Sequence, residues 1–260
     1  MTKSNLVHCL QDDIGFVELV KKDVDEQALS VVNAARCSYG KESEEFTDKD
    51  KKLTGYLWTH EHTSPFRHTT FRFHIKVPLF VFRQWTKYQV GCAWRKYEID
   101  GDPVSFAAFD LFYDTDKGCS WNELSGRYKE MDPEFYVPHR LRGNPGHGIS
   151  KQSSGELDWD SVRMEGYKKN LRDKFRSDYR HYTSMLQDGV AKEIARTTLP
   201  QSIYTEAYWT VSLQALLHFL HQRLKPDAQF EIRHCALAVY DLTKDVITDK
   251  LGITYEQIVA

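Results

Sequence analysis

A carboxylate, a carboxamide, two hydroxyls and a guanidinium surround one glycine in residues 120–128. The guanidinium of Arg127 is a planar fork of N–H donors that suits a phosphate or the edge of a pyrimidine. Gly126 lets the backbone turn tightly or approach a ligand closely. Taken alone, the Ser-Gly-Arg sequence also fits a surface turn beside a helix cap. The segment therefore predicts a polar ligand only in combination with other parts of the chain.

Such parts exist in Phe82–Trp85, which contains Gln84, in Glu193–Pro200, which contains Arg196, and after Tyr208–Val211, where Arg223 follows. A pyrimidine nucleotide has a phosphate dianion at one end and a base with donors and acceptors at the other. A site for it needs several fixed arginines and a few amides. Each arginine alone is also an ordinary surface charge. The residues expected to contact the nucleotide are Gln84, Glu123, Leu124, Ser125, Gly126, Arg127, Arg196 and Arg223.

Together with His60–Phe66 and Ala228–Ile232, these segments resemble the flavin-dependent thymidylate synthases along nearly the whole chain. In that family, Arg-Gln-Trp leads into Arg-His-Arg and, a few residues later, into Ser-x-Asn-Glu-x-Ser-x-Arg-Tyr. Here the pattern starts at Arg83 and its second half arrives only at Ser120. The stretch between them, about residues 92–119, resembles an insertion.

The resemblance implies an α+β fold: one domain over residues 1–260, with a central, mostly antiparallel sheet and long packed helices. It implies methylation of C5 of deoxyuridylate (dUMP) to give dTMP, with methylenetetrahydrofolate as the carbon donor and FAD reduced by NADPH. The protein's part would be to align these cofactors over the uracil ring and polarise a uracil carbonyl. Arg223 and Arg127 are the expected catalytic residues. The family's assembly implies a homotetramer with active sites at subunit contacts.

The same resemblance assigns a second set of residues to the cofactors: Ser38, His62, Ser64, Lys87, Tyr88, Gln89, Ser212, Gln214 and His218. Several differ from the family pattern. Residues 87–89 replace Arg-His-Arg, Arg67 stands where the family tends to have Glu, and residues 212, 214 and 218 replace Asn, Arg and Asn. A lysine meets a pyrophosphate as a point charge without the bidentate fork. We expect FAD to be held differently here. The alternative function is a diverged pyrimidine-nucleotide-binding or modifying protein with lost or altered flavin use.

Four histidines, His60, His62, His68 and His74, are close enough in sequence to raise a metal site as another alternative. They lack a compact His-x-x-x-His pair and nearby cysteine ligands. We therefore predict no metal, and place His62 in a flavin or folate cavity.

The composition of the 260-residue chain excludes several functions. Its net charge of −2 offers no basic field for nucleic acid or an anionic membrane. No apolar run approaches the roughly 20 residues of a membrane helix. The five cysteines are odd in number and scattered, and no apolar signal region follows the start. These features predict a soluble, cytoplasmic protein without a disulfide framework.

The elements that must position the site follow from periodicity and caps. Strands are expected at 15–20 and at 69–77, where alternate residues are apolar. Helices are expected at 25–36, 48–59, from Pro78 to the Arg83–Gln84 pair, from Asp160 to Gly189, around Arg196–Leu199, at 206–222 and from Pro226 to Val246. Residues 131–155 are rich in Pro and Gly and predict a loop, with only 135–137 resembling a strand.

Overall fold

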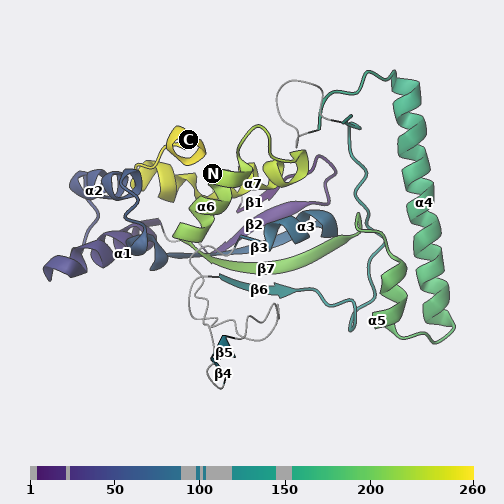
Figure 1. The fold of residues 1–260 in the computed structure, drawn as a ribbon, viewed down its shortest axis with the longest axis horizontal. Coiled ribbons are helices and arrows are strands. Elements are labelled where there is room, and N and C mark those ends of the chain that lie inside the picture. The colour runs from purple at the N-terminus through teal and green to yellow at the C-terminus, as the bar shows by residue number, and fades with distance from the viewer. Residues whose placement is uncertain (1–4, 22–23, 89–97, 100–101, 104–118, 145–153) are drawn as a thin grey trace.

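The computed structural model describes residues 5–21, 24–88, 98–99, 102–103, 119–144 and 154–260 (Figure 1). Its centre is a five-stranded sheet in the order β1 (Leu6–His8), β2 (Phe16–Lys21), β3 (Thr70–Pro78), β7 (Tyr204–Ser212) and β6 (Cys119–Glu123). Every neighbouring pair is antiparallel. The expected α+β single domain with a mostly antiparallel sheet is confirmed.

Strand β3, the middle strand of the sheet, has an alternating sequence. Phe71, Phe73, Ile75 and Val77 are buried, whereas Arg72 is exposed and His74 is half-buried. Successive side chains of a strand point to opposite faces, so one face of β3 belongs entirely to the core. Pro78 then starts helix α3 (Leu79–Trp85), as predicted.

The prediction of a helix over 206–222 is wrong in its first half. Residues 204–212 form β7, which pairs along its whole length with β3 and on its other side with β6. Thr205, Thr210 and Val211 are β-branched and suit a strand, and pairing on both sides outweighs the helix-like spacing of the apolar residues. Only Leu213–Arg223 is helical, as α6.

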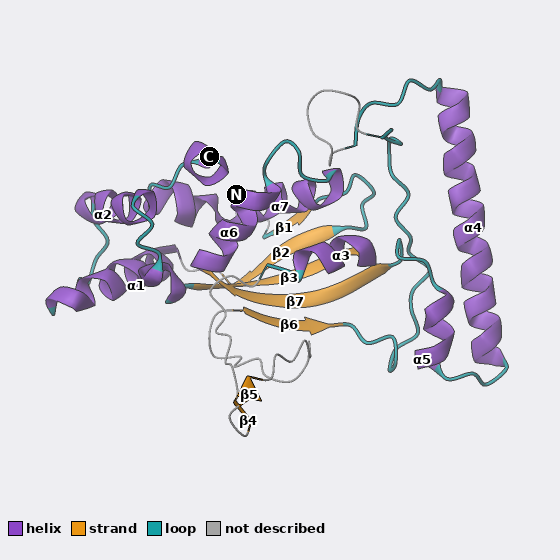
Figure 2. Ribbon diagram, in the orientation of Figure 1, coloured by secondary structure: helices purple, strands orange, loops and turns teal. Residues whose placement is uncertain are grey.

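Helices α3, α6 and α7 (Phe230–Lys244) cover one face of the sheet (Figures 1 and 2). Large rings fill the space between: Trp85 stacks on Phe219 at 4.9 Å, and Trp209 of β7 contacts both. All three rings are fully buried. These ring contacts fix α3 and α6 on the sheet, and with them the polar residues at the ends of the two helices.

Shorter elements complete the fold. They are α1 (Val24–Arg36), η1 (Cys37–Tyr39), α2 (Asp48–Thr59), η2 (Ser64–Arg67), β4 (Glu98–Ile99), β5 (Asp102–Pro103), α5 (Lys192–Ala195), η3 (Arg196–Thr198), η4 (Asp245–Lys250) and α8 (Tyr255–Val259). The expected helices at 25–36 and 48–59 are confirmed. The last long helix begins at Phe230 rather than at Pro226. Strands β1 and β6 were not expected.

Helix α4 (Ser161–Gln187) stands beside the sheet at one end of the molecule (Figure 2). Asp160 caps it as predicted, accepting from the Arg163 amide at 2.7 Å. Its C-terminal half packs through Tyr182 on the loop at Met131, whereas Val162 at its start is 81% exposed. Residues 135–137 form no strand, since Phe135 makes only an isolated bridge to Ile203.

Most of the expected insertion at about 92–119 lies outside the described residues. Within it, β4 and β5 pair as a two-stranded sheet, and Cys119 already belongs to β6. The helices in the described part of the chain include none long and apolar enough to cross a membrane.

Candidate active site

The first polar group lies where β6 ends, and we call it the β6-end group: Glu123, Ser125, Gly126, Arg127 and Arg196. A tight turn follows the strand, since the Ser125 carbonyl accepts from the amides of Tyr128 and Lys129 at 3.0 and 3.1 Å. A Cβ on Gly126 would lie 3.2 Å from Cδ of Arg196 and 3.0 Å from Sδ of Met131. The absence of a side chain at Gly126 therefore lets Arg196 of η3 lie close beside the turn.

Glu123 joins this group to α3. Its carboxylate accepts from the Thr205 hydroxyl at 2.9 Å. Desolvation raises the pKa of Glu123, against the Thr205 hydrogen bond and the charges of Arg196 and Arg83, which lower it. The two arginines thus flank one carboxylate that reaches the surface. This placement lets the Glu123 carboxylate orient an arginine, and Thr205 is the partner that the sequence did not indicate.

Arg127 and Arg196 both face solvent. The Arg127 guanidinium lies over the Tyr128 ring, 5.5 Å from its centre, and forms a long ion pair, 3.5 Å from its Nε to Glu193. The side chains of Arg127 and Glu193 are both 55% exposed. Two exposed guanidinium groups beside a turn have the chemistry to bind an anion without a large desolvation cost. Leu124 differs from its neighbours: its amide donates to the Glu206 carbonyl at 2.8 Å, and its side chain packs with Met131.

The second polar group runs along α6, and we call it the α6 row: Gln214, His218 and Arg223, with Tyr88 against its end. The Arg223 guanidinium lies 4.8 Å from the centre of the Tyr88 ring. Its Nε is buried, and none of the described residues accepts its hydrogen. Burial lowers the pKa of His218, helped by His221, so this ring is neutral near pH 7. Tyr88 contacts both ends of this arrangement, since its ring centre is also 5.9 Å from that of His218.

The N-terminal end of the α6 row is already hydrogen-bonded within the chain. Gln214 accepts from Nε of Arg67 at 2.5 Å and donates to the Thr63 hydroxyl at 2.9 Å. Thr63 lies between the predicted residues His62 and Ser64, both exposed. The structure thus brings these two next to Gln214.

The remaining residues predicted to bind cofactors lie in separate local environments. Ser212 is buried, and its hydroxyl caps α6 by accepting from the Ala215 amide at 3.3 Å. Ser38 is exposed in η1, and Lys87 is exposed just after α3. Gln89 lies outside the described residues.

Gln84 begins a chain of polar side chains that sequence reasoning missed. It donates from Nε2 to Oε1 of Gln229, and Gln229 donates from its own Nε2 to Oε2 of Glu231 at 2.9 Å. Arg142 donates to Oε1 of the same carboxylate. The signal was present in Ala228–Ile232, where two polar residues sit two apart at the start of a helix, but nothing in the sequence indicated their partner.

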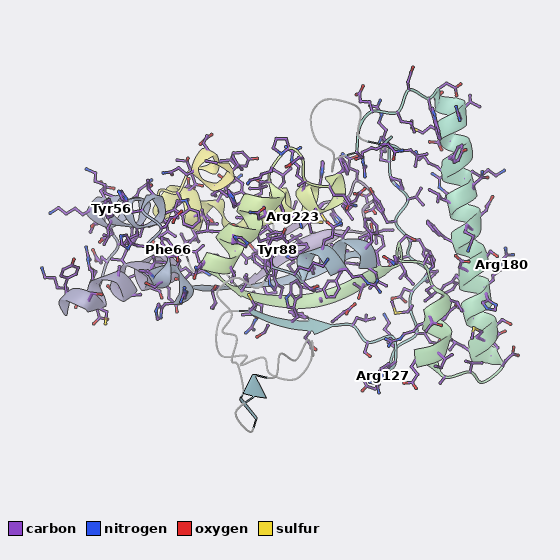
Figure 3. All side chains as sticks on the ribbon, viewed as in Figure 1. Tyr56, Phe66, Tyr88, Arg127, Arg180 and Arg223 are labelled. Carbon is purple, nitrogen blue, oxygen red and sulfur yellow. The ribbon has the colours of Figure 1, made fainter. Side chains whose placement is uncertain are left out.

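The two groups do not meet within one chain. Figure 3 shows Arg127 beyond the end of the sheet, below α5, whereas Arg223 and Tyr88 lie over its middle. Because Arg127 and Arg223 are separated in this view, they are at least that far apart in space. Within one chain, Arg127 and Arg223 thus lie in different parts of the molecule.

The histidines are dispersed. His60 stacks on Tyr56 at 3.9 Å, and His74 lies between Glu18 and Glu206 at 3.3 and 3.4 Å. Among the described residues, no cluster of three or more metal-ligating side chains occurs.

Comparison with known proteins agrees with this architecture. Residues 18–100 and 103–247 match the family model of the thymidylate synthase complementing protein. The flavin-dependent thymidylate synthase of Kosmotoga olearia is 37% identical over 93% of this chain and 89% of its own. That of Thermus thermophilus is 36% identical over 90% of this chain and 73% of its own.

A solved structure supports the fold as well. The UMP/dUMP methylase PolB from Streptomyces cacaoi, bound with 5-Br dUMP, is 26% identical with a TM-score of 0.69, covering 98% of this chain and 94% of that one. The chain is an enzyme of the methyltransferase class. It belongs to the thymidylate synthase complementing protein family, whose curated relatives compared here are flavin-dependent thymidylate synthases.

Proposed function

We propose that this enzyme methylates C5 of dUMP to give dTMP, with methylenetetrahydrofolate as carbon donor and FAD reduced by NADPH. The observation that carries the proposal is the β6-end group, where Gly126 lets Arg196 approach the turn that presents Arg127. That arrangement suits a phosphate dianion. A relative of the same fold, named as a UMP/dUMP methylase, is bound with 5-Br dUMP, which supports a pyrimidine nucleotide here.

The α6 row fits a flavin ring. Tyr88 and His218 offer flat, uncharged surfaces. These two rings would hold the flavin, with exposed Lys87 near its phosphates. When bound, the flavin supplies the electrons that turn the transferred methylene into a methyl group. Desolvation raises the pKa of Tyr88, against the charge of Arg223, so its hydroxyl stays protonated at neutral pH.

The roles of the chain's own residues follow from charge and geometry. Arg127 and Arg196 bind the phosphate, and Glu123 orients Arg196. Arg223 directs its unsatisfied donor to a uracil carbonyl and stabilises the charge that develops there. No cysteine nucleophile is required. The methylene donor and NADPH supply the carbon and two electrons, and tetrahydrofolate and NADP⁺ are released.

A homotetramer with shared sites is part of the proposal. A nucleotide that contacts both Arg127 and Arg223 must take them from different copies, since they lie apart in one chain (Figure 3). Helix α4 offers a surface for that contact, because Val162 is 81% and Tyr167 48% exposed. Light scattering should give four times the chain mass of 30.4 kDa. A monomeric mass at micromolar concentration would refute the assembly.

Mixing two inactive variants tests the shared site directly. R127A and R223A each remove one side of the site, and after subunit exchange a mixed oligomer contains some sites with both arginines. Activity should reappear on mixing. If the mixture stays as inactive as its components while subunit exchange is verified by mass, each site is built by one copy.

The activity itself is tested by titrating FAD by fluorescence and then assaying dUMP with NADPH and methylenetetrahydrofolate, following the product by mass. Protein purified without added flavin should be largely colourless, because residues 87–89 lack the forked arginines of the family pattern. Added FAD should bind and support dTMP formation. Intact dUMP binding without any flavin binding would instead favour a nucleotide-binding protein. Two observations favour that alternative. The Gln214 side chain is already hydrogen-bonded within the chain, and the Ser212 hydroxyl caps α6.

A further inference from the structure

Glu231 is a buried carboxylate whose two oxygens have different partners. Its side chain is 2% exposed. Arg142 and the Tyr136 hydroxyl donate to Oε1, whereas Gln229 donates to Oε2. Burial acts to raise the pKa of Glu231, but the hydrogen bonds from Arg142 and Gln229 and the charge of Arg142 outweigh it and lower the pKa. The group is therefore ionised near neutral pH and can only accept hydrogen bonds.

Because Glu231 only accepts hydrogen bonds, it fixes the orientation of both side-chain amides in the series from Gln84 through Gln229 to Glu231. Gln229 must turn its NH₂ group to Glu231, which leaves its Oε1 facing Gln84. Gln84 must then donate from Nε2. If either amide were reversed, two oxygens or two NH₂ groups would face each other at one of the contacts. The carbonyl oxygen of Gln84 is thereby turned away from Gln229, and no described residue donates to it.

We propose that Glu231 and Gln229 are positioning residues that hold Gln84 as a hydrogen-bond acceptor for the bound nucleotide. The ligand group that meets Gln84 is then a donor: the imide N–H of an oxidised pyrimidine or a sugar hydroxyl. Gln84 can play this part because it is half-buried at the end of α3, next to Arg83, which faces the β6-end carboxylate Glu123. The inference rests on the proposed function and specifies how that site selects its ligand.

Three nucleotides identify the donor. dUMP carries both donors, its N3-methyl derivative lacks the imide N–H, and its 3′-deoxy derivative lacks the sugar hydroxyl. Calorimetry with wild-type protein should show an affinity loss of about tenfold for one of the two derivatives. With Gln84→Ala, that derivative and dUMP should bind equally. The inference is overturned if both derivatives bind the wild type as dUMP does, or if the loss persists unchanged in Gln84→Ala.

The positioning role has its own variants. Gln229→Met keeps the side-chain length and leaves the Arg142 and Tyr136 bonds to Oε1 of Glu231 in place. It frees the Gln84 amide and removes the donor to Oε2. It should raise the dUMP KM several-fold, leave kcat within about twofold, and abolish the discrimination between dUMP and its derivative. Glu231→Gln should act in the same direction. If loss of the Arg142 partner prevents Glu231→Gln from folding, Gln229→Met still decides.

Tyr136→Phe is the matched control. It removes a 2.9 Å hydrogen bond to the same carboxylate, but at Oε1, the oxygen that Gln229 does not use. Affinity and discrimination should stay within about twofold of wild type. Equal losses in Tyr136→Phe and Gln229→Met would mean that the carboxylate matters only for folding. If the wild type binds none of the three nucleotides, the proposed function fails. If it binds dUMP but Gln229→Met discriminates as well as wild type, the positioning role alone is wrong.

Discussion

Replacing Arg127 with alanine should weaken dUMP binding about 30-fold with little loss of stability. A hydrogen bond to a charged group contributes about 1.5–3 kcal/mol. The lower half of that range applies because the Arg127 side chain is 55% exposed and Glu193, 3.5 Å from its Nε, competes for it. About 2 kcal/mol corresponds to a factor of roughly 30 in Kd. The lost ion pair itself lies between exposed side chains and contributes about 0–1 kcal/mol to folding.

The assay is isothermal calorimetry with dUMP, with urea unfolding as the check on stability. Lys129→Ala is the matched control, because Lys129 lies two residues away, is 56% exposed and pairs with Asp132 rather than with the β6-end group. It removes the same charge, and two unit charges roughly 10 Å apart in water interact by only about 0.4 kcal/mol. Its effect should be below twofold. A loss under threefold for Arg127→Ala, or an equal loss for Lys129→Ala, would refute a direct phosphate contact.

Three further predictions concern folding. Gly166→Ala should stabilise the protein by about 0.5–1 kcal/mol in urea, because Gly166 lies inside α4 with no atom within 4 Å of the added Cβ; a loss would mean that this face is covered in the assembly. Asp160→Ala should cost about 1 kcal/mol through loss of the α4 cap, measured the same way; an unchanged midpoint would contradict the cap. Burial raises the pKa of Glu123 above its ordinary value of 4.5. The contribution of its protonated form to the free energy of unfolding is therefore fully present below pH 4.5 and is lost as pH rises through the folded-state pKa. Glu123→Gln should therefore gain stability relative to the unliganded wild type between pH 4 and pH 8, and a difference that does not vary with pH would exclude this.

Local sequence predicted the elements whose signals are local. Helix α2 has the predicted bounds, and α4 begins at its predicted cap, Asp160. The burial alternation of β3 could be seen in its residues, because a strand's period of two is intrinsic to its backbone. The segment 204–212 was predicted wrongly because its apolar spacing also fits a helix. Its state depends on β3 and β6, strands about 130 and 85 residues away in the chain.

For the site, residue types and the family resemblance determined which side chains take part, since arginine forks, amides and a close-approach glycine are chemical properties of single residues. Their grouping was decided by the tertiary structure. Pairing of β6 with β7 puts Glu123 beside Thr205, and the turn after β6 meets η3 at Arg196. The start of α7 delivers Gln229 to Gln84, 145 residues earlier in the chain. Contacts between residues so far apart exist only after the sheet and its covering helices have packed, so no local pattern can encode which amide meets which carboxylate.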